Sequence, residues 1–122
     1  MKIDFNNTEP IYIQIENYIK KQIVSKEIKG GEKLPSVRDL SSSLKVNPNT
    51  IQRAYSELER EELAYTKRGT GKFITEDENI INNLKIDMAK EIVNKFILDM
   101  SQLGFEKENI MEMLRNKIKE WA

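Results

Sequence analysis

The stretch LPSVRDLSSSLKVNPNTIQRAYSELE, residues 34–59, decides the fold of this chain. Ser36 with Asp39 three residues later is typical of a helix start, because the hydroxyl can accept a hydrogen bond from a free amide of the first turn. Asn47 followed by Pro48 marks a second start, since Asn is a favoured cap and proline at the first helical position loses no hydrogen bond. The stretch therefore predicts a short helix, a tight turn and a second helix, the order of a helix-turn-helix.

The second helix of this pair has two unlike faces. Apolar residues recur at steps of three, one and three, at Ile51, Ala54, Tyr55 and Leu58. Polar side chains recur with the same steps on the complementary face, at Asn49, Gln52, Arg53 and Ser56. We expect the first face to meet a core and the second to be exposed. Asn and Gln side chains suit adenine and Arg suits guanine, so the first polar residues are predicted to read base edges in the major groove. They are Asn49, Thr50, Gln52 and Arg53.

A helix is predicted before this stretch and a β-hairpin after it. Isoleucines recur every four residues from Ile11 to Ile23, which indicates the buried stripe of an amphipathic helix ending near Lys26. Pro10 is expected in the first turn of that helix, with Thr8 or Glu9 as its cap. Downstream, residues 63–66 and 72–75 include strand-favouring types and flank a glycine-containing loop, residues 67–71.

Cations flank the proposed reading helix where DNA phosphates would lie. They are Lys33, Arg38 and Lys45 around the turn, and Lys67, Arg68 and Lys72 on the hairpin. For Lys33 and Lys45, simple solvation is an open alternative. Gly69 and Gly71 would let the hairpin tip approach a sugar-phosphate backbone closely. Acids gather instead at the far end of the second helix, at Glu57, Glu59, Glu61 and Glu62.

Composition narrows the classes of function. The 122 residues are 39% hydrophobic and 33% charged and contain no Cys or His, which excludes disulfides and zinc sites built on those residues. The commonest general base is also missing, so we expect neither an enzyme nor a cofactor or metal. Residues 1–75 hold 13 Lys and Arg against 10 Asp and Glu, whereas residues 76–122 hold 7 against 10. No apolar run approaches the roughly 20 residues of a membrane span, and a cytoplasmic protein is expected.

The rest of the chain is predicted to form two helices. One carries an apolar stripe and should stop at Gly104, and the other runs from about Glu106 to Trp121. The stripe of the first comprises Ile81, Leu84, Met88, Ile92, Phe96, Met100 and Leu103. We therefore expect a DNA-binding domain over residues 1–76 and a helical tail over 77–122. The tail is too small to enclose a large pocket, so a dimer clamp is favoured, with a small effector at the subunit interface as an open alternative.

Residues 34–59, together with YTKRGTGKFI at 65–74, closely resemble the GntR family of bacterial regulators. PIYIQI (10–15), VNPNTIQRAY (46–55) and the short tail resemble its YtrA-type subgroup. The resemblance covers the chain up to about Ile74. It implies a mainly α fold with a small β-hairpin, a winged helix-turn-helix, followed by a two-helix dimerisation tail, and a homodimeric repressor that binds an operator. The DNA contacts implied by motif position are Arg38, Asn47, Asn49, Thr50, Gln52, Arg53 and Gly71.

Two positions depart from the family pattern. Many members carry Arg where this chain has Pro48, so one contact of the wider family is absent. Glu62 stands where a helix-ending Gly is usual. Either the backbone there is left-handed, which would cost a non-glycine residue roughly 1 kcal/mol, or the helix ends differently.

Three other functions can be compared with DNA binding. A winged helix can serve as a protein-interaction module without touching DNA, although a polar face paired with a cationic, glycine-tipped hairpin favours DNA. The run Gly69-Thr70-Gly71-Lys72 invites a phosphate-loop interpretation, but Thr66 holds the position of the first glycine and Phe73 follows the lysine. A carboxylate-based enzyme lacks a pair of acids on an evidently apolar surface.

Overall fold

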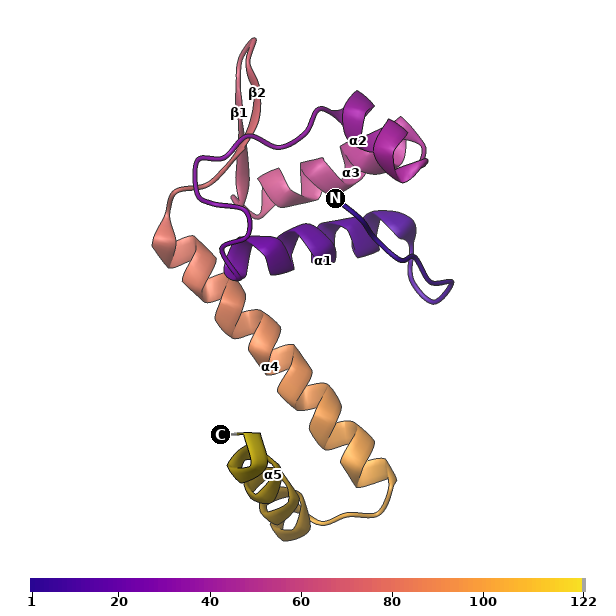
Figure 1. Ribbon diagram of the computed structural model, residues 1–122, viewed down its shortest axis with the longest axis vertical. Helices are drawn as coiled ribbons and strands as arrows, with labels where there is room; N and C mark the ends of the chain where they lie inside the picture. Colours follow the sequence, from indigo (N-terminus) through magenta and orange to yellow (C-terminus); the bar gives the residue numbers. More distant parts are fainter. Residues whose placement is uncertain (122) are drawn as a thin grey trace. The chain divides into compact units, whose positions relative to one another are not determined.

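The computed structural model describes residues 1–121, which form five helices and a two-stranded β-hairpin (Figure 1). In chain order they are α1 (Ile11–Val24), α2 (Val37–Leu44), α3 (Pro48–Arg60), β1 (Ala64–Lys67), β2 (Gly71–Ile74), α4 (Glu78–Gln102) and α5 (Lys107–Trp121). The predicted mainly α class with one small hairpin is confirmed. The chain divides into two compact units, Met1–Lys85 and Ile86–Ala122, and α4 begins in the first and continues into the second.

The core of the first unit forms where α1 and α3 lie side by side (Figure 1). Ile15, Ile19 and Ile23 of the predicted α1 stripe are buried, whereas Ile11 at its start is half-buried against the core. The whole apolar face of α3 is buried. Leu34, Leu40, Leu63, Ile74 and Ile81 extend this core to α2, the hairpin and the start of α4. Burying one such large aliphatic side chain contributes about 1.5–3 kcal/mol, so this packing fixes how α3 is rotated about its own axis.

Both predicted caps of the helix-turn-helix are present. The Ser36 hydroxyl accepts a hydrogen bond from the backbone N–H of Asp39 at 3.0 Å. The Asn47 side-chain oxygen accepts one from the N–H of Asn49 at 2.8 Å, and Pro48 opens α3. Since each helix begins at its own cap, the turn between α2 and α3 has a fixed length.

The expected start of α1 was wrong. Pro10 is itself the cap residue, α1 begins at Ile11 and ends at Val24, and no side chain caps it. The physical reason lies in Gln14, whose side-chain amide donates to the carbonyls of Asn6 at 3.0 Å and Glu9 at 2.8 Å. Those bonds hold the preceding residues in a loop, so Thr8 and Glu9 do not reach the first turn.

The hairpin is shifted by one residue from its predicted bounds. Lys67 pairs with Gly71 inside the ladder, which leaves a three-residue loop, and Ala64 rather than Leu63 begins β1. The segment before α2 adds a third, short pairing to β2, with a bridge between Lys33 and Phe73 and a 2.8 Å bond from the Leu34 N–H to the Lys72 carbonyl. The wing, defined here as residues 64–74, is therefore supported on one side by residues 32–34.

The second unit buries little of its own surface. Gly104 follows the end of α4 with φ +92°, as predicted for the stop. Among residues 86–121, Ile110 is the buried hydrophobic side chain. The large exposed ones are Ile86, Ile92, Val93, Phe96, Ile97, Leu98, Leu103, Phe105, Met111, Met113, Leu114, Ile118 and Trp121.

Of the two helix endings left open at Glu62, the structure has the left-handed backbone, with φ +63°. We expect Glu62→Gly to raise the free energy of unfolding by about 0.5–1 kcal/mol, because glycine adopts this conformation without a Cβ clash. Urea unfolding of the variant measures the gain. Glu62→Ala is the matched control, since it removes the charge and keeps the strain. An equal gain in both variants would mean that charge, and not backbone strain, is the cause.

Candidate nucleic-acid interface

The reading face of α3, defined as Asn49, Gln52, Arg53 and Ser56, is exposed along its whole length. On the opposite side Ile51, Ala54 and Leu58 are 0% exposed. The prediction that the polar side chains face outward and the apolar ones inward is therefore confirmed. Thr50 is half-buried at the edge of this face. The start of α3 also presents the positive end of the helix dipole, which favours an anion such as a phosphate.

Arg53 is held over an aromatic ring. Its guanidinium carbon lies 3.9 Å from the ring centroid of Tyr12, which belongs to the first turn of α1. No ion pair or side-chain hydrogen bond involves Arg53 among residues 1–121. Its neighbour Gln52 donates to the Ser56 hydroxyl over a long 3.5 Å contact. The donors of both side chains thus remain available to a ligand.

Two hydrogen bonds fix α2 and the turn relative to α3. The Tyr55 hydroxyl donates to the carbonyl of Pro35 at 2.7 Å, and burial raises the pKa of Tyr55, which keeps it a neutral donor. The Ser41 hydroxyl donates to the Val46 carbonyl at 2.8 Å and closes the turn. These bonds place Arg38, which is exposed on the first turn of α2, on the same helix-turn-helix as the reading face.

The wing carries exposed cations at its tip. Lys67, Arg68 and Gly69 are all exposed, and the Lys67 ammonium lies 4.7 Å from the ring centroid of Phe73. Gly71 has φ +136°, and a Cβ added there would lie 2.8 Å from Cε of Lys33. The structure therefore brings Lys33 against the wing, whereas Lys45 is exposed in the turn with a left-handed backbone.

Lys72 differs from the other wing cations because it forms an ion pair with Glu59 of α3. The Thr66 hydroxyl donates to the same carboxylate at 2.9 Å. The hydrogen bond from Lys72 lowers the pKa of Glu59, against the opposing effect of partial burial. This cluster ties the wing to the C-terminal half of α3, so that wing and reading helix form one rigid surface.

Comparison with known proteins identifies this arrangement. Residues 11–74 match the model of the bacterial regulatory proteins of the gntR family, which is more than half of the chain. The chain belongs to the GntR family. It is accordingly a winged helix-turn-helix protein and a DNA-binding transcriptional regulator.

Individual GntR relatives resemble the chain over nearly its whole length. It is 44% identical to the HTH-type transcriptional regulator YhcF of Bacillus subtilis (strain 168), over 94% of this chain and 95% of that protein. It is 38% identical to the HTH-type transcriptional repressor YtrA of the same organism, over 94% and 89%. A solved GntR family regulator from Listeria monocytogenes is 49% identical and superposes with a TM-score of 0.84, over 92% of this chain and 98% of that one. The expected resemblance to the YtrA-type subgroup is thus confirmed.

At the C-terminal end of α3, the cations of the GntR domain are paired with carboxylates of the same chain. Lys20 of α1 lies 2.9 Å from Glu16 and 2.8 Å from Glu61, and Arg60 lies 2.7 Å from Glu57. Desolvation raises the pKa of Glu16. Burial opposes ionisation of Glu61, but its hydrogen bonds with Lys20 and Glu16 and the nearby charges of Lys20 and Arg60 together lower its pKa. The cations here are satisfied by the protein itself, which separates this end from the exposed cations at the turn and the wing.

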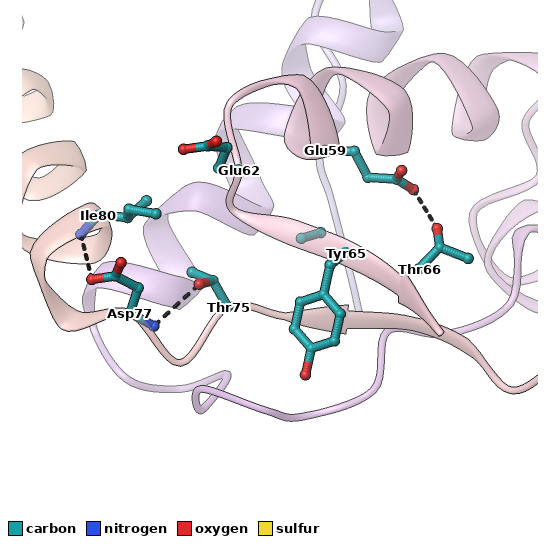
Figure 2. A pocket seen from close by; sticks show the side chains of 8 residues that line it. Glu59, Glu62, Tyr65, Thr66, Thr75, Asp77 and Ile80 are labelled. Carbon is teal, nitrogen blue, oxygen red and sulfur yellow. Dashed lines mark hydrogen bonds between the residues drawn. The ribbon is translucent and has the colours of Figure 1, made fainter. Parts of the chain in front are cut away.

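An open groove of about 700 Å³ lies behind the wing (Figure 2). Figure 2 shows Glu59, Glu62 and Asp77 around it, with the Asp77 carboxylate accepting the Ile80 N–H and the Thr75 hydroxyl accepting the Asp77 N–H. The acidic side chains of this lining would repel phosphate. Within residues 1–121 no cluster of acidic side chains is arranged to hold a metal ion, and no helix is long and apolar enough to cross a membrane.

Sequence reasoning missed two residues at this GntR interface. Tyr12 lies inside the quoted PIYIQI motif, but its place beneath Arg53 depends on how α1 packs on α3. Glu59 was grouped with the acids of the far end, although it reaches Lys72 on the wing. The sequence does hold a signal for this pair, since Lys72, 13 positions after Glu59, has the opposite charge. That signal becomes informative only when the hairpin register is known.

We expect Glu59→Gln to destabilise the protein at pH 7 by about 0.2–1 kcal/mol, a range suited to a half-exposed ion pair. A carboxylate with a lowered pKa stabilises the fold above its unfolded pKa of about 4.3, and that contribution is lost as the pH falls through the folded value. Urea unfolding at several pH values should therefore show the penalty shrinking in acid. Lys72→Met and the double variant complete the cycle, and fully additive losses would show that the two side chains do not interact.

Proposed function

We propose that the protein is a homodimeric repressor that binds a pseudo-palindromic operator through α3 and the wing. The observation that carries this proposal is the exposed reading face of α3, which has hydrogen-bonding tips on one side and a fully buried apolar stripe on the other. A recognition helix needs this division, because its base-reading side chains must be free in solution and its axis must be held by the core.

Base contacts are assigned to the start of α3. Arg53 suits a guanine through its paired N–H donors, and Asn49 and Gln52 suit adenine. Thr50, half-buried at the edge of the face, is assigned a contact from its hydroxyl. Asn47 caps α3 and Asn49 lies in its first turn, where the positive end of the helix dipole supports docking against a phosphate.

Phosphate contacts are assigned to the exposed cations and to the wing tip. Arg38, Lys67 and Arg68 are exposed and have no ion-pair partner in residues 1–121. The space beside the Gly69 Cα is open, since a Cβ added there would meet nothing within 4 Å. This gives a DNA backbone room to approach, and Gly71 lies at the base of the same loop. The contact from Lys72 stays a prediction, since its ammonium is shared with Glu59 and would have to turn away from it.

The tail is proposed to join two copies. Residues 86–121 expose a long series of large apolar side chains, including Ile92 at 67% and Trp121 at 86%. Large apolar side chains exposed in this number mark an interaction site, and a second copy offers the same side chains. We assign residues 1–76 to DNA binding and 77–122 to dimerisation. Two reading helices related by a twofold axis would then contact half-sites about one helical turn or more apart.

Repression follows from occupancy of the operator, and it is supported by the similarity to a relative named as a repressor. The proposal includes a cytoplasmic location and no catalytic activity. Operators can be recovered by selecting fragments of the source genome that bind the purified protein, with and without added metabolites to detect an effector. Binding that falls steeply with salt supports DNA docking over a protein-interaction module, because phosphate contacts release counterions.

Arg53→Ala should weaken binding to a recovered operator by about 10- to 100-fold, the value of one bidentate base contact. Arg38→Ala should weaken operator and random DNA alike, as expected for a phosphate contact. Both side chains are exposed, so thermal unfolding should stay nearly unchanged. Gel shifts measure the affinities, with Arg60→Ala at the far end of α3 as the matched control. Parental affinity in both Arg53→Ala and Arg38→Ala would refute the assigned surface.

Ile92→Asp combined with Phe96→Asp should shift the protein toward monomer, because it places charges within the proposed dimer stripe. Sedimentation equilibrium measures the change. Asn94→Asp on the same helix is the control, since it adds a charge at an exposed polar position. The monomer should lose affinity for a two-half-site duplex and keep its affinity for one half-site. An unchanged dimer would place the interface elsewhere.

A further inference from the structure

The feature that carries a further inference is the stack of Arg53 on Tyr12. We propose that Tyr12 is a positioning residue for base recognition, which holds the Arg53 guanidinium flat so that its N–H edge faces a guanine. The inference deepens the function proposed above and rests on it. Tyr12 itself needs no contact with DNA for this role.

The geometry of the stack determines which donors remain free. A guanidinium is planar and has five N–H donors, all directed outward in its plane. With its carbon 3.9 Å from the Tyr12 centroid, the ring can cover one face of that plane. Hydrogen bonds to the O6 and N7 of guanine lie in the guanidinium plane, so stacking restrains Arg53 without using the donors that read the base.

The ring is itself held in place. Tyr12 is half-buried and packs against the core, in the first turn of α1. Two residues on, Gln14 bonds to the carbonyls of Asn6 and Glu9 and so clamps the loop that enters the helix. Since α1 also packs along α3, the position of the ring is fixed relative to the reading face.

Preorganisation gives this contact its effect on affinity. A free arginine loses side-chain entropy when it docks, at a cost of about 0.5–1.5 kcal/mol for a flexible side chain. An arginine that is already stacked has lost part of that freedom before binding. A similar cation–ring contact occurs on the wing, where the Lys67 ammonium lies 4.7 Å from the Phe73 centroid. An ammonium is a point charge without a planar set of donors, so this contact does not orient it as the Tyr12 ring orients Arg53.

The test uses the full-length protein and two duplexes of equal length, one recovered operator and one random sequence, in fluorescence anisotropy titrations. Tyr12→Leu should weaken operator binding by about 3- to 30-fold, the range of a cation–π contact, with little effect on the random duplex. Tyr12→Phe keeps the ring face and should bind within about twofold of the parent. Tyr18→Leu, which removes a half-buried tyrosine elsewhere on α1, is the matched control and should bind as the parent does.

The Arg53→Ala background separates positioning from a general structural role. If Tyr12 acts through Arg53, Tyr12→Leu should cause no further loss in that background, whereas an equal loss in both backgrounds overturns the inference. A second measurement does not depend on DNA. In the free protein the Arg53 Nε–H proton resonance should be shifted upfield by the ring current in the parent and in Tyr12→Phe, and should return downfield in Tyr12→Leu.

The proposed sequence-specific reading and the proposed role of Tyr12 are refuted by different results. A parent protein that binds both duplexes equally overturns sequence-specific reading, and this inference with it. A parent that prefers the operator, together with a Tyr12→Leu variant that binds as the parent does, overturns the role of Tyr12 alone.

Discussion

Burial of the apolar face of α3 against α1 is the constraint on which the rest of the structure depends. Ile51, Ala54 and Leu58 are completely buried, and each large aliphatic among them contributes about 1.5–3 kcal/mol. Turning α3 by one residue would exchange such side chains for Gln52 or Arg53, and an unpaired buried charge costs several kcal/mol more. The outward direction of the reading face is therefore a consequence of core packing, and it requires no bound DNA.

The same packing sorts the cations into two groups. At the C-terminal half of α3, Lys20, Arg60 and Lys72 each have a carboxylate partner. Near the N-terminal half and the wing tip, Arg53 and Lys67 rest on aromatic rings, which hold a cation without neutralising it. Arg53 and Lys67 therefore keep charges that no carboxylate neutralises among residues 1–121, although the chain has a net charge of +0. This distribution favours an extended polyanion over a small acidic ligand.

Local signals in the sequence predicted most of this fold. The Ser36 and Asn47 caps, the faces of α3 and the stop at Gly104 each depend on neighbouring residues, and all are present. The start of α1 was predicted wrongly because Gln14 captures two loop carbonyls, a choice that helix-start rules do not include. Tyr12 beneath Arg53 could not be found either, since the two lie far apart in the sequence and only the packing of two helices brings them together.

The proposal of a second copy is supported by the small size of the reading surface. One bidentate side-chain contact discriminates between bases by about 1–3 kcal/mol, whereas operator binding generally exceeds non-specific binding by about 4–10 kcal/mol. Among the residues proposed to read bases, Arg53 is restrained by the Tyr12 ring. Each DNA-binding domain contains one such arginine. The first unit completes its core with Ile81 at the start of α4, so its packing does not depend on the residues of the tail beyond Lys85. Joining two copies makes the second half-site contact intramolecular, which raises affinity without any new base contact. In the proposed dimer, the exposed apolar residues of the tail would be the means by which a small reading surface is used twice.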